Sequence, residues 1–445
     1  MARMVFIGAG SYAFTLQLVV DTLGYEELRD TEFVFMDIDR ERLGNVKTVV
    51  QAYLKSHGFD NPTSYTTNRQ TALTGADFVV LLAKIGQMEA CYQDMDIPKK
   101  YGLKQTIGDI CGVGGIFRGL RTMPFLFDML KDMEELSNTN AMVLNYTNPP
   151  PSLVLFASQV SPIPFIGLCH SVQGTTIRMA EFLGLPYEEM AFKVGGINHM
   201  AWVTEMTHQG RDVYPEYRQK AAKFDIYSQD ISIDDPYFPQ LGAARLDMLR
   251  RTGYQVTESS VHFPEYVPYY LRDEEHIRKY RIPVDQYKTN VARREEKFDK
   301  VLAQAKKGQL PEFQPSVEYC SQIIRAIKTN QPCTIYATVP NTGLITNLPE
   351  FSAVEVKCHV DRNGVQPVHF GALPSHLAAL CTTNILAHQQ AVLAILERSR
   401  KHVYYALMLD PLTHTLLDLD QIEELADTLI EKQKKYLGAY LKKGS

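Results

Sequence analysis

Short apolar runs and longer amphipathic runs alternate along the first 200 residues of the chain. The apolar runs are predicted strands, at Met4–Ile7, Thr31–Met36, Phe78–Leu82, Ala141–Leu144 and Pro164–Leu168. The amphipathic runs are predicted helices, at residues 11–24, 39–56, 120–137, 150–159 and 171–184. Strands that alternate with helices predict a parallel sheet with helices on its faces, and continuous apolar runs are typical of strands buried on both faces. The pattern therefore predicts an α/β fold that begins with a Rossmann-type sheet.

The rhythm changes after Gly195. A mixed stretch is followed by a Tyr-rich, charged stretch at 254–290, and helices are predicted at 314–328, 375–399 and 420–438. This pattern predicts a C-terminal α+β domain. We therefore expect two domains, residues 1–195 and residues 196–445, and because no low-complexity linker separates them, we expect them to pack against each other.

Composition and charge exclude several classes of protein. The chain has 445 residues, of which 45% are hydrophobic and 22% charged, as in ordinary globular proteins. A net charge of −5 gives no reason to expect a nucleic acid or an anionic membrane as partner, since both require a concentrated basic surface. No apolar run approaches the roughly 18 residues that span a bilayer. The seven cysteines are irregularly spaced and contain no C-x-x-C pair, so we expect a reducing, cytoplasmic location.

A glycine-rich turn follows the first predicted strand. The sequence GAGSYA matches the dinucleotide-binding pattern G-x-G-x-x-A, in which Gly8 allows the tight turn, Gly10 lets a pyrophosphate approach the backbone, and Ala13 allows close packing. Ser11 stands at the start of the next helix, whose free N–H groups attract phosphate. Asp37 ends the second strand, where a carboxylate would bind a ribose 2′-hydroxyl, so we expect NAD rather than NADP at these residues.

Four further stretches combine polar or soft ligands with turn residues, and we expect each at the end of a strand. They are GDICGVGGIFRGLR (108–121), NYTNPP (145–150), GLCHSVQGTT (167–176) and GINHMAW (196–202). Ligands of open parallel sheets bind beyond the carboxyl ends of the strands, so the stretches should converge beside the cofactor, with Asn145 in contact with it. Cys169 and His199 are candidate ligands of a catalytic metal, which needs an incomplete protein shell. A buried thiol and a packed imidazole are the alternative interpretation.

Several motifs together resemble glycoside hydrolase family 4, the NAD- and metal-dependent glycosidases. They are FIGAGS, MDID, QTIGDICGVGGIFRGLRT, NYTNP, GLCHSVQGT, GINHMAW, VTESSVHFPEY and GLITNLP, and the resemblance runs from residue 4 to beyond residue 410. It is closest to the bacterial α-galactosidases of the family, which carry Cys-His-Ser at the metal site. The resemblance implies a fold like that of lactate and malate dehydrogenases.

The resemblance also implies a mechanism. In this family NAD⁺ takes hydride from C3 of the sugar, and the resulting ketone acidifies the C2 proton, which a base removes. The glycosidic oxygen then leaves from C1, water adds, and hydride returns to C3. A divalent metal, typically Mn²⁺, holds the C2 and C3 oxygens. The net reaction is hydrolysis, which makes the family an exception to the two-carboxylate scheme of glycosidases.

Site residues follow from the resemblance by position. Cys169 and His199 match the metal ligands, and Tyr266 matches the Tyr that acts as base on C2. A phenol has a pKa near 10, so this role requires a cation that lowers it. Asp109 matches an acidic residue that tunes this Tyr, and Asn148 matches a substrate-binding Asn.

Two departures from the phospho-sugar branch of the family bear on the substrate. His170 follows the metal Cys where that branch has Asp or Asn, and Gln93 stands where that branch has a phosphate-binding Arg. An unphosphorylated sugar is therefore expected. Arg293 and Arg294 both fit the position of a second phosphate-binding Arg. His170 is predicted to protonate the leaving oxygen, the alternative being that it only orients Cys169.

The leading hypothesis is an α-galactosidase that acts on small glycosides by transient oxidation, as a homodimer or homotetramer. Within the family the alternatives are an α-glucosidase and an α-glycosidase for a uronic acid, such as an α-galacturonidase or glucuronidase. From another class, an NAD-dependent hydroxy-acid or sugar dehydrogenase would share the fold without needing the metal pair or Tyr266. A non-catalytic NAD-binding regulator is disfavoured by the number of polar residues expected in one crevice.

Overall fold

The N-terminal half forms the predicted parallel sheet. A computed structural model describes residues 1–226 and 242–442, apart from the side chains of Tyr12 and Ala13. Six strands are parallel in the order β6-β5-β4-β1-β2-β3. They are β1 (Arg3–Ile7), β2 (Glu32–Met36), β3 (Thr63–Thr66), β4 (Phe78–Leu81), β5 (Met142–Asn145) and β6 (Phe165–Gly167). All four residues of β4 and of β5 are buried, which explains their continuous apolar sequence.

The same sheet continues into the C-terminal half with antiparallel strands. These are β11 (Cys333–Pro340), β12 (Ala353–Asp361), β7 (Met190–Ile197), β8 (Met200–His208) and β10 (Gln255–Val256), with β13 (Gly364–Pro367) paired to β12 and β9 (Arg211–Asp212) to β8. Thr338 of β11 pairs with Gly167 of β6, and this pairing joins the two halves. The boundary expected after residue 195 falls inside β7, so the division into two domains stays a prediction.

Helices cover the sheet. Those of the first half are α1 (Tyr12–Leu23), α2 (Arg40–Ser56), α3 (Arg69–Leu73), α4 (Gln87–Lys100), α5 (Gly112–Leu136), α6 (Pro150–Val160) and α7 (Ser171–Leu183). Those of the second half are α8 (Tyr214–Ala222), α10 (Ala243–Thr252), α11 (Glu274–Lys279), α12 (Gln286–Lys306), α13 (Cys320–Thr329), α14 (Ser375–Leu396), α15 (Arg400–Leu409), α16 (Thr413–Leu416), α17 (Leu419–Lys432) and α18 (Lys434–Leu437). Three single turns of 3-10 helix are η1 (Glu26–Leu28), η2 (Tyr187–Glu189) and η3 (Phe263–Tyr266).

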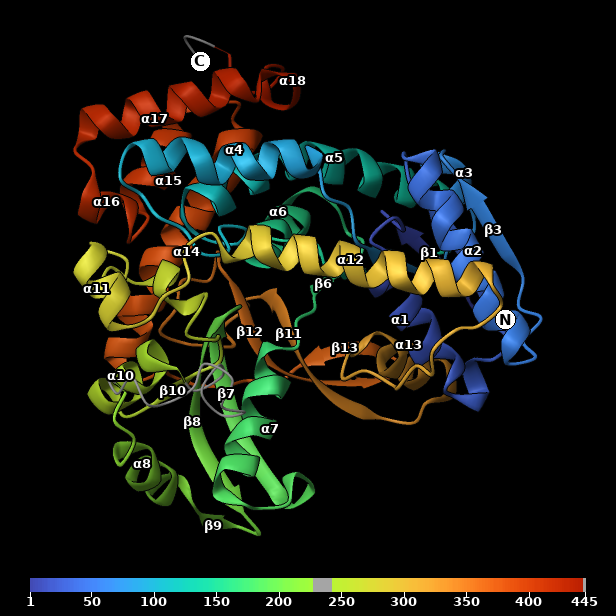
Figure 1. Cartoon of the computed structure of the whole chain (residues 1–445), viewed down its shortest axis with the longest axis horizontal. Helices are drawn as coiled ribbons and strands as arrows, with labels where there is room; N and C mark the ends of the chain where they lie inside the picture. Colours follow the sequence, from blue (N-terminus) through green and yellow to red (C-terminus); the bar gives the residue numbers. More distant parts are fainter. Residues whose placement is uncertain (227–241, 443–445) are drawn as a thin grey trace.

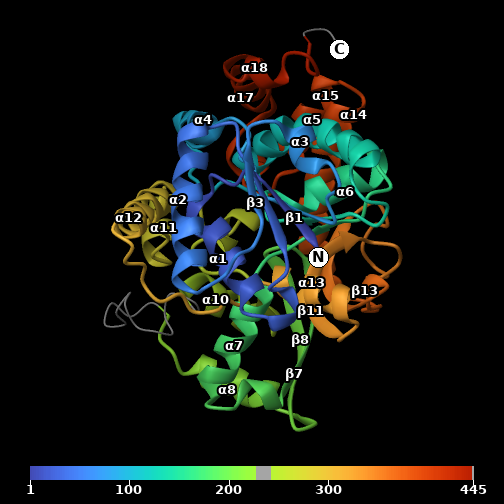
Figure 2. The same ribbon diagram turned by 90° about the vertical axis from the view of Figure 1, so that its right-hand side faces the viewer.

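The helices form layers on both sides of the parallel strands. α1, α2 and α12 pack together on one side, and α5, α6 and α14 on the other (Figure 2). The α12 ribbon crosses the front of the molecule, and the β7–β8 hairpin projects with α7 and α8 as a separate lobe (Figure 1). α14 is the one helix of the described residues that is long and apolar enough to cross a membrane, but half of its apolar window is buried inside the protein. Its packing against α5, α6 and α15 accounts for this apolarity.

All five predicted strands are present, but some elements differ from the expectation. The edge strand β3 has the sequence TSYT, which contains no apolar run, and it was therefore missed. α5 begins at Gly112, eight residues before the predicted start, because its glycines were interpreted as a loop. They allow the preceding loop to fold onto the helix, since a Cβ on Gly114 would lie 2.1 Å from the oxygen of Gly108. The long helices α4 and α12 were not predicted.

Candidate active site

The glycine turn between β1 and α1 has the geometry of a dinucleotide cradle. Gly8 has a φ of +86°, and a Cβ there would lie 2.6 Å from the Ala83 backbone, so only glycine fits. The Gly10 N–H donates to the Asp37 carboxylate at 2.7 Å, and the Asp39 N–H donates to the other oxygen at 2.9 Å. The carboxylate expected to bind ribose therefore lies at the turn. Ser11 stands exposed at the start of α1, as predicted.

The predicted metal ligands converge from two elements that are thirty residues apart in the chain. Cys169 follows β6, and His199 lies in the two-residue turn of the β7–β8 hairpin with a φ of +65°. The Cys169 Sγ lies 3.2 Å from His199 Nε2. The other ring nitrogen, Nδ1, lies 3.1 Å from the carboxylate of Glu258. A carboxylate on the far nitrogen is the usual partner of a metal-binding imidazole, so the donor atoms fit a divalent cation bound by sulfur and Nε2.

These three groups form a chain of charges. Burial raises the pKa of the Cys169 thiol, but the His199 imidazolium outweighs this effect and brings the pKa to about 6. Burial lowers the pKa of His199, but Glu258 and the Cys169 thiolate raise it to about 10. The N–H of Ser171, the first residue of α7, lies 3.4 Å from the sulfur and adds the positive end of a helix dipole. Cys169 is therefore a thiolate at neutral pH, the form that binds metals.

Asp109 and Asn148 lie together at the start of α5 and α6. The Asn148 amide donates to Asp109 Oδ2 at 2.8 Å, and Arg118 of α5 donates to the same oxygen at 3.1 Å. Asp109 Oδ1 is buried and has no hydrogen-bond partner in the part of the chain that the structure describes. Asn145 is fully buried, and its side chain bonds only to the backbone of Thr147 among the described residues, so it shapes the NYTNPP loop.

Tyr266, the predicted base, ends η3 and is fully buried. Among the described residues its hydroxyl has no hydrogen-bond partner, and its ring centroid lies 6.3 Å from that of His199. Burial raises the pKa of the Tyr266 phenol well above 10, and the negative charge of Glu258 acts in the same direction. These residues of the protein therefore keep Tyr266 protonated, and only an added cation would lower its pKa.

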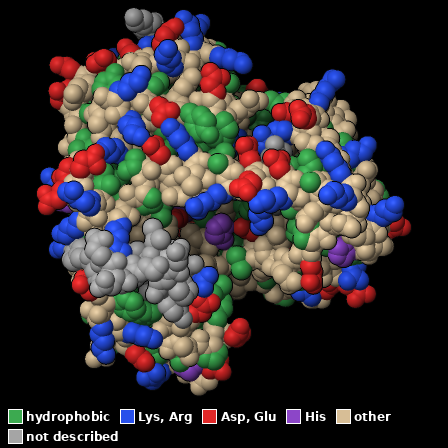
Figure 3. Space-filling model, in the orientation of Figure 1, with side chains coloured by type: hydrophobic (Ala, Val, Ile, Leu, Met, Phe, Trp, Pro, Cys, Tyr) green, Lys and Arg blue, Asp and Glu red, His purple; other side chains and the backbone are tan. Residues whose placement is uncertain are grey.

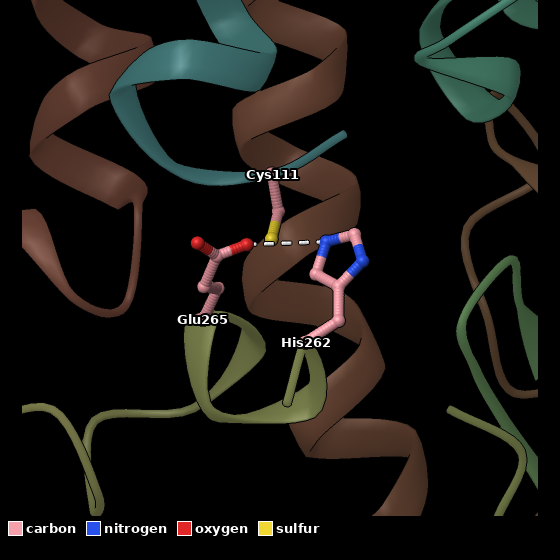
Figure 4. Close-up of side chains that lie close together, drawn as sticks. All are labelled: Cys111, His262 and Glu265. Carbon is pink, nitrogen blue, oxygen red and sulfur yellow. Dashed lines mark ion pairs between the residues drawn. The ribbon is translucent and has the colours of Figure 1, made fainter. Parts of the chain in front are cut away.

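A buried cluster of polar side chains joins the QTIGDIC loop (residues 105–111) to η3. Glu265 accepts N–H groups from Thr106 at 2.5 Å and from Ile107 and Gly108 at 3.0 Å. The second oxygen of Glu265 lies 3.1 Å from His262 Nε2, and the thiol of Cys111 faces this pair (Figure 4). Glu265 thus fixes the loop that carries Asp109 relative to the helical turn that carries Tyr266.

Two sets of side chains have donor atoms within 4.8 Å of one another, Cys111 with His262 and Glu265, and His199 with Glu258 and His262. The first set suits a metal poorly because the Glu265 charge is already compensated by backbone N–H groups. Burial raises the pKa of the Cys111 thiol well above 9, so it stays protonated. The second set lies on the Nδ1 side of His199 and supports the imidazole rather than replacing Cys169.

His170 lies at the entrance of the site. Its side chain is 62% exposed, and its Nδ1 lies 2.9 Å from the buried carboxylate of Glu318. The hydrogen bond to Glu318 and the charge of the Cys169 thiolate raise the pKa of His170 to about 9. The molecule is hollowed between α12 and the lobe of β7 and β8, and a histidine side chain is visible in this hollow (Figure 3).

Cationic groups lie near the KIGQ turn (residues 84–87), which follows β4. Burial and the charge of Arg118 lower the pKa of Lys84 to about 8, and the charge of Arg294 adds to this effect. Arg294 therefore lies close enough to Lys84 to repel its charge. Gln93 is in α4, where its amide lies 3.5 Å from Glu89 of the same helix.

The four polar stretches reach the site by different routes than predicted. NYTNPP and GLCHSVQGTT do follow parallel strands, β5 and β6. GDICGVGGIFRGLR instead forms the loop before α5 and its first turns, and GINHMAW forms a hairpin turn. The prediction that each lies at a strand end is therefore wrong for GDICGVGGIFRGLR, because glycine signals turns and helix starts alike. It is confirmed for GINHMAW, whose turn follows the end of the antiparallel strand β7.

Five further residues at the site were not predicted: Glu258, His262, Glu265, Glu318 and Glu355. The first three lie within VTESSVHFPEY, whose density of ionisable residues was a usable signal. Glu355 in β12 accepts from the buried Asn198 amide at 3.3 Å, and burial raises its pKa to about 8. No local signal marks Glu318 or Glu355, since both act through contacts with distant segments.

The fold and the site define an α/β enzyme with a Rossmann-type half and a polar centre at the carboxyl edge of its sheet. The model of the Family 4 glycosyl hydrolase matches residues 3–185, and that of the Family 4 glycosyl hydrolase C-terminal domain matches residues 194–413. The chain therefore belongs to family 4 of the glycosyl hydrolases, as the motifs indicated.

Named relatives support this membership over nearly the whole chain. An alpha-galactosidase of Bacillus subtilis is 37% identical, with 99% of this chain and 100% of the relative covered. An alpha-galactosidase of Rhizobium meliloti is 30% identical, with 98% and 89% covered. An alpha-galacturonidase of Thermoanaerobacter italicus is 26% identical, with 98% and 97% covered.

Solved structures show the same fold. A 6-phospho-alpha-glucosidase from gut microorganisms, in complex with NAD and Mn²⁺, is similar with a TM-score of 0.82 at 20% identity, and 98% of each chain is covered. A malate dehydrogenase of Plasmodium falciparum in complex with NADH is similar with a TM-score of 0.50 at 12% identity, covering 89% of this chain and 99% of that chain. The expected relationship to the lactate and malate dehydrogenase fold is confirmed.

Proposed function

We propose that this protein is an α-galactosidase that cleaves unphosphorylated α-galactosides with the help of NAD and Mn²⁺. The observation that carries the proposal is the convergence of Cys169 Sγ and His199 Nε2 at 3.2 Å, in a chain that also has a glycine turn with the geometry of a dinucleotide cradle. A dehydrogenase of the lactate or malate type does not need a thiolate and imidazole pair backed by Glu258. The alpha-galactosidases of Bacillus subtilis and Rhizobium meliloti support this choice of sugar.

The residues present fit both groups. Gly8, Gly10 and Asp37 would hold NAD at the end of β1 and β2, and Cys169 and His199 would hold the cation. When bound, NAD would accept hydride from the sugar and return it, and the cation would polarise the sugar oxygens as a Lewis acid.

The protein's own residues then divide the remaining work. Tyr266 would remove the C2 proton. Asp109, whose Oδ1 has no hydrogen-bond partner among the described residues, would tune Tyr266. Glu265 fixes the loop that carries Asp109. Asn148 donates to Asp109 in the structure and would turn the rest of its amide toward a sugar hydroxyl. His170, at the entrance, would give a proton to the leaving oxygen.

One incubation tests the proposal. The protein is supplied with NAD⁺, Mn²⁺ and a reductant in deuterated water, together with aryl α-galactoside, α-glucoside and α-galacturonide. We expect galactose release without net NADH and with deuterium at C2. Steady NADH accumulation without cleavage would instead identify a dehydrogenase.

A second candidate, an α-galacturonidase, is favoured by one observation. No carboxylate of the described residues forms an ion pair with Lys84, although Arg118 and Arg294 lie near enough to lower its pKa. Such a cationic group would suit the C6 carboxylate of a uronic acid. Faster cleavage of the α-galacturonide than of the α-galactoside in the same panel would decide for this alternative.

A further inference from the structure

The contact between His170 and Glu318 joins the entrance of the site to a distant segment. His170 is 62% exposed whereas Glu318 is 8% exposed, and 148 residues separate them in the chain. The buried Glu318 carboxylate contacts the imidazole ring of His170 and therefore fixes the orientation of that side chain. With Nδ1 held at 2.9 Å from Glu318, only Nε2 remains for a substrate.

Glu318 is itself held by elements of the dinucleotide-binding half. Its backbone N–H donates to the hydroxyl of Ser316 at 3.1 Å. The N–H of Ser316 donates at 2.8 Å to Asp21, a buried residue of α1. On the other side of Glu318, the N–H of Cys320 donates at 3.3 Å to the hydroxyl of Tyr146 in the NYTNPP loop. Glu318 therefore has a fixed position relative to both the glycine turn and the substrate-facing loop.

We propose that Glu318 is a positioning residue that orients His170 so that Nε2 protonates the departing glycosidic oxygen. This inference rests on the proposed function. It adds a residue that is needed mainly for substrates with poor leaving groups. Holding a proton donor in the right orientation matters most when the leaving oxygen cannot depart as an anion. A sugar alcohol is such a leaving group, and a dinitrophenol is not.

The proton balance of the step is simple. As the C1–O bond breaks, its electron pair goes to the glycosidic oxygen, which takes the proton from His170 Nε2. The electron pair of the C2–H bond becomes the C1–C2 double bond, and Tyr266 takes that proton and exchanges it with solvent. When water adds to C1, one proton of the water goes to His170 Nε2, and C2 receives a solvent-derived proton from Tyr266.

The test compares two leaving groups. We measure kcat/KM for a disaccharide α-galactoside and for 2,4-dinitrophenyl α-galactoside with Glu318→Gln, His170→Asn and the double variant. Glu312→Gln is the matched control, because Glu312 is exposed in the same segment. Glu318→Gln should lower the disaccharide rate at least about tenfold and the dinitrophenyl rate less than about twofold. The double variant should match His170→Asn, since the two residues act as one unit.

The possible outcomes separate this proposal from the function. Equal losses on both leaving groups, or losses that multiply in the double variant, would overturn the positioning role. If Glu318→Gln does not fold, as judged by Trp202 fluorescence, Glu318→Asp is used instead, because it keeps the charge. It should lower kcat/KM for the disaccharide more than kcat/KM for the dinitrophenyl galactoside, but by a smaller factor than is expected for Glu318→Gln. If the wild-type protein cleaves neither galactoside nor any other α-glycoside, the proposed function fails first.

Discussion

At the scale of residues, the site depends on groups whose charges stabilise one another. Cys169 would be a neutral thiol in an apolar pocket, and His199 would be a neutral imidazole. Together with Glu258 they form a thiolate, an imidazolium and a carboxylate in line. The left-handed backbone of His199, unusual for a residue with a Cβ, persists because the hairpin and these contacts fix it.

Replacing the predicted metal ligand should weaken metal binding without unfolding the protein. Cys169→Ser should weaken Mn²⁺ binding at least about tenfold and reduce glycoside cleavage at least as much, because a hydroxyl is a far poorer ligand than a thiolate. Mn²⁺ affinity is measured by calorimetry. Cys333→Ser serves as the control, because Cys333 lies in β11 and, among the described residues, its sulfur forms a hydrogen bond only with the oxygen of Gln322. Unchanged affinity in Cys169→Ser would remove the metal assignment.

At the scale of elements, the position of the QTIGDIC loop depends on its packing against α5, η3 and α14. The QTIGDIC loop lies against the glycines of α5 on one side and is held by Glu265 of η3 on another. α14 also supports this loop, because its His388 forms a hydrogen bond with the backbone of Ile110. The loop is therefore fixed by packing rather than by its own conformational preference.

The pH dependence of stability should reveal His388. Burial lowers the pKa of His388 from 6.5 to about 4. Between these two pH values His388 is therefore protonated in the unfolded chain and neutral in the folded protein. Unfolding free energy therefore falls as the pH falls through this window, and this residue accounts for about 2 kcal/mol between about pH 7 and about pH 5.

The measurement uses urea unfolding of the wild type and of His388→Gln at several pH values. The variant should lose about 2 kcal/mol less than the wild type over this range, because Gln does not titrate. His359→Gln, at an exposed position of β12, is the control. Parallel pH profiles for the wild type and His388→Gln would show that His388 is not the responsible group.

At the scale of the whole molecule, two features join the halves. One is the continuous sheet, and the other is a clasp, the buried hydrogen bonds of Arg121 and Gln433 to Asp94. β6 pairs with β11, and the C-terminal helices return to the N-terminal half (Figure 1). There Arg121 of α5 and Gln433, between α17 and α18, both donate to the fully buried Asp94 of α4, Gln433 at 2.6 Å. Burial raises the pKa of Asp94, so each donor is needed to satisfy this carboxyl.

Removing one donor of this clasp should destabilise the whole chain. Gln433→Ala should lower the free energy of unfolding by about 2 kcal/mol, because a buried hydrogen bond to a charged group is lost. Glu424→Gln, exposed on α17, should change it by less than about 0.5 kcal/mol. Trp202, the single tryptophan, lies in the β7–β8 lobe and reports unfolding by fluorescence. A normal Trp202 transition in Gln433→Ala would show that the halves unfold independently.

The sequence by itself determined the α/β class, the five apolar strands, the glycine turn and the pair Cys169 and His199. The first three features are local, since hydrophobic periodicity and backbone freedom act within a few residues. The pair, thirty residues apart, was predicted because strand ends meet at one edge of a sheet and because the family motifs contain both residues. Only the tertiary structure decided that one sheet spans the chain, that Glu258 and Glu318 support the two histidines, and that Tyr266 is buried without a partner. These depend on contacts between segments up to 148 residues apart and on the low dielectric of the interior, which no local pattern records.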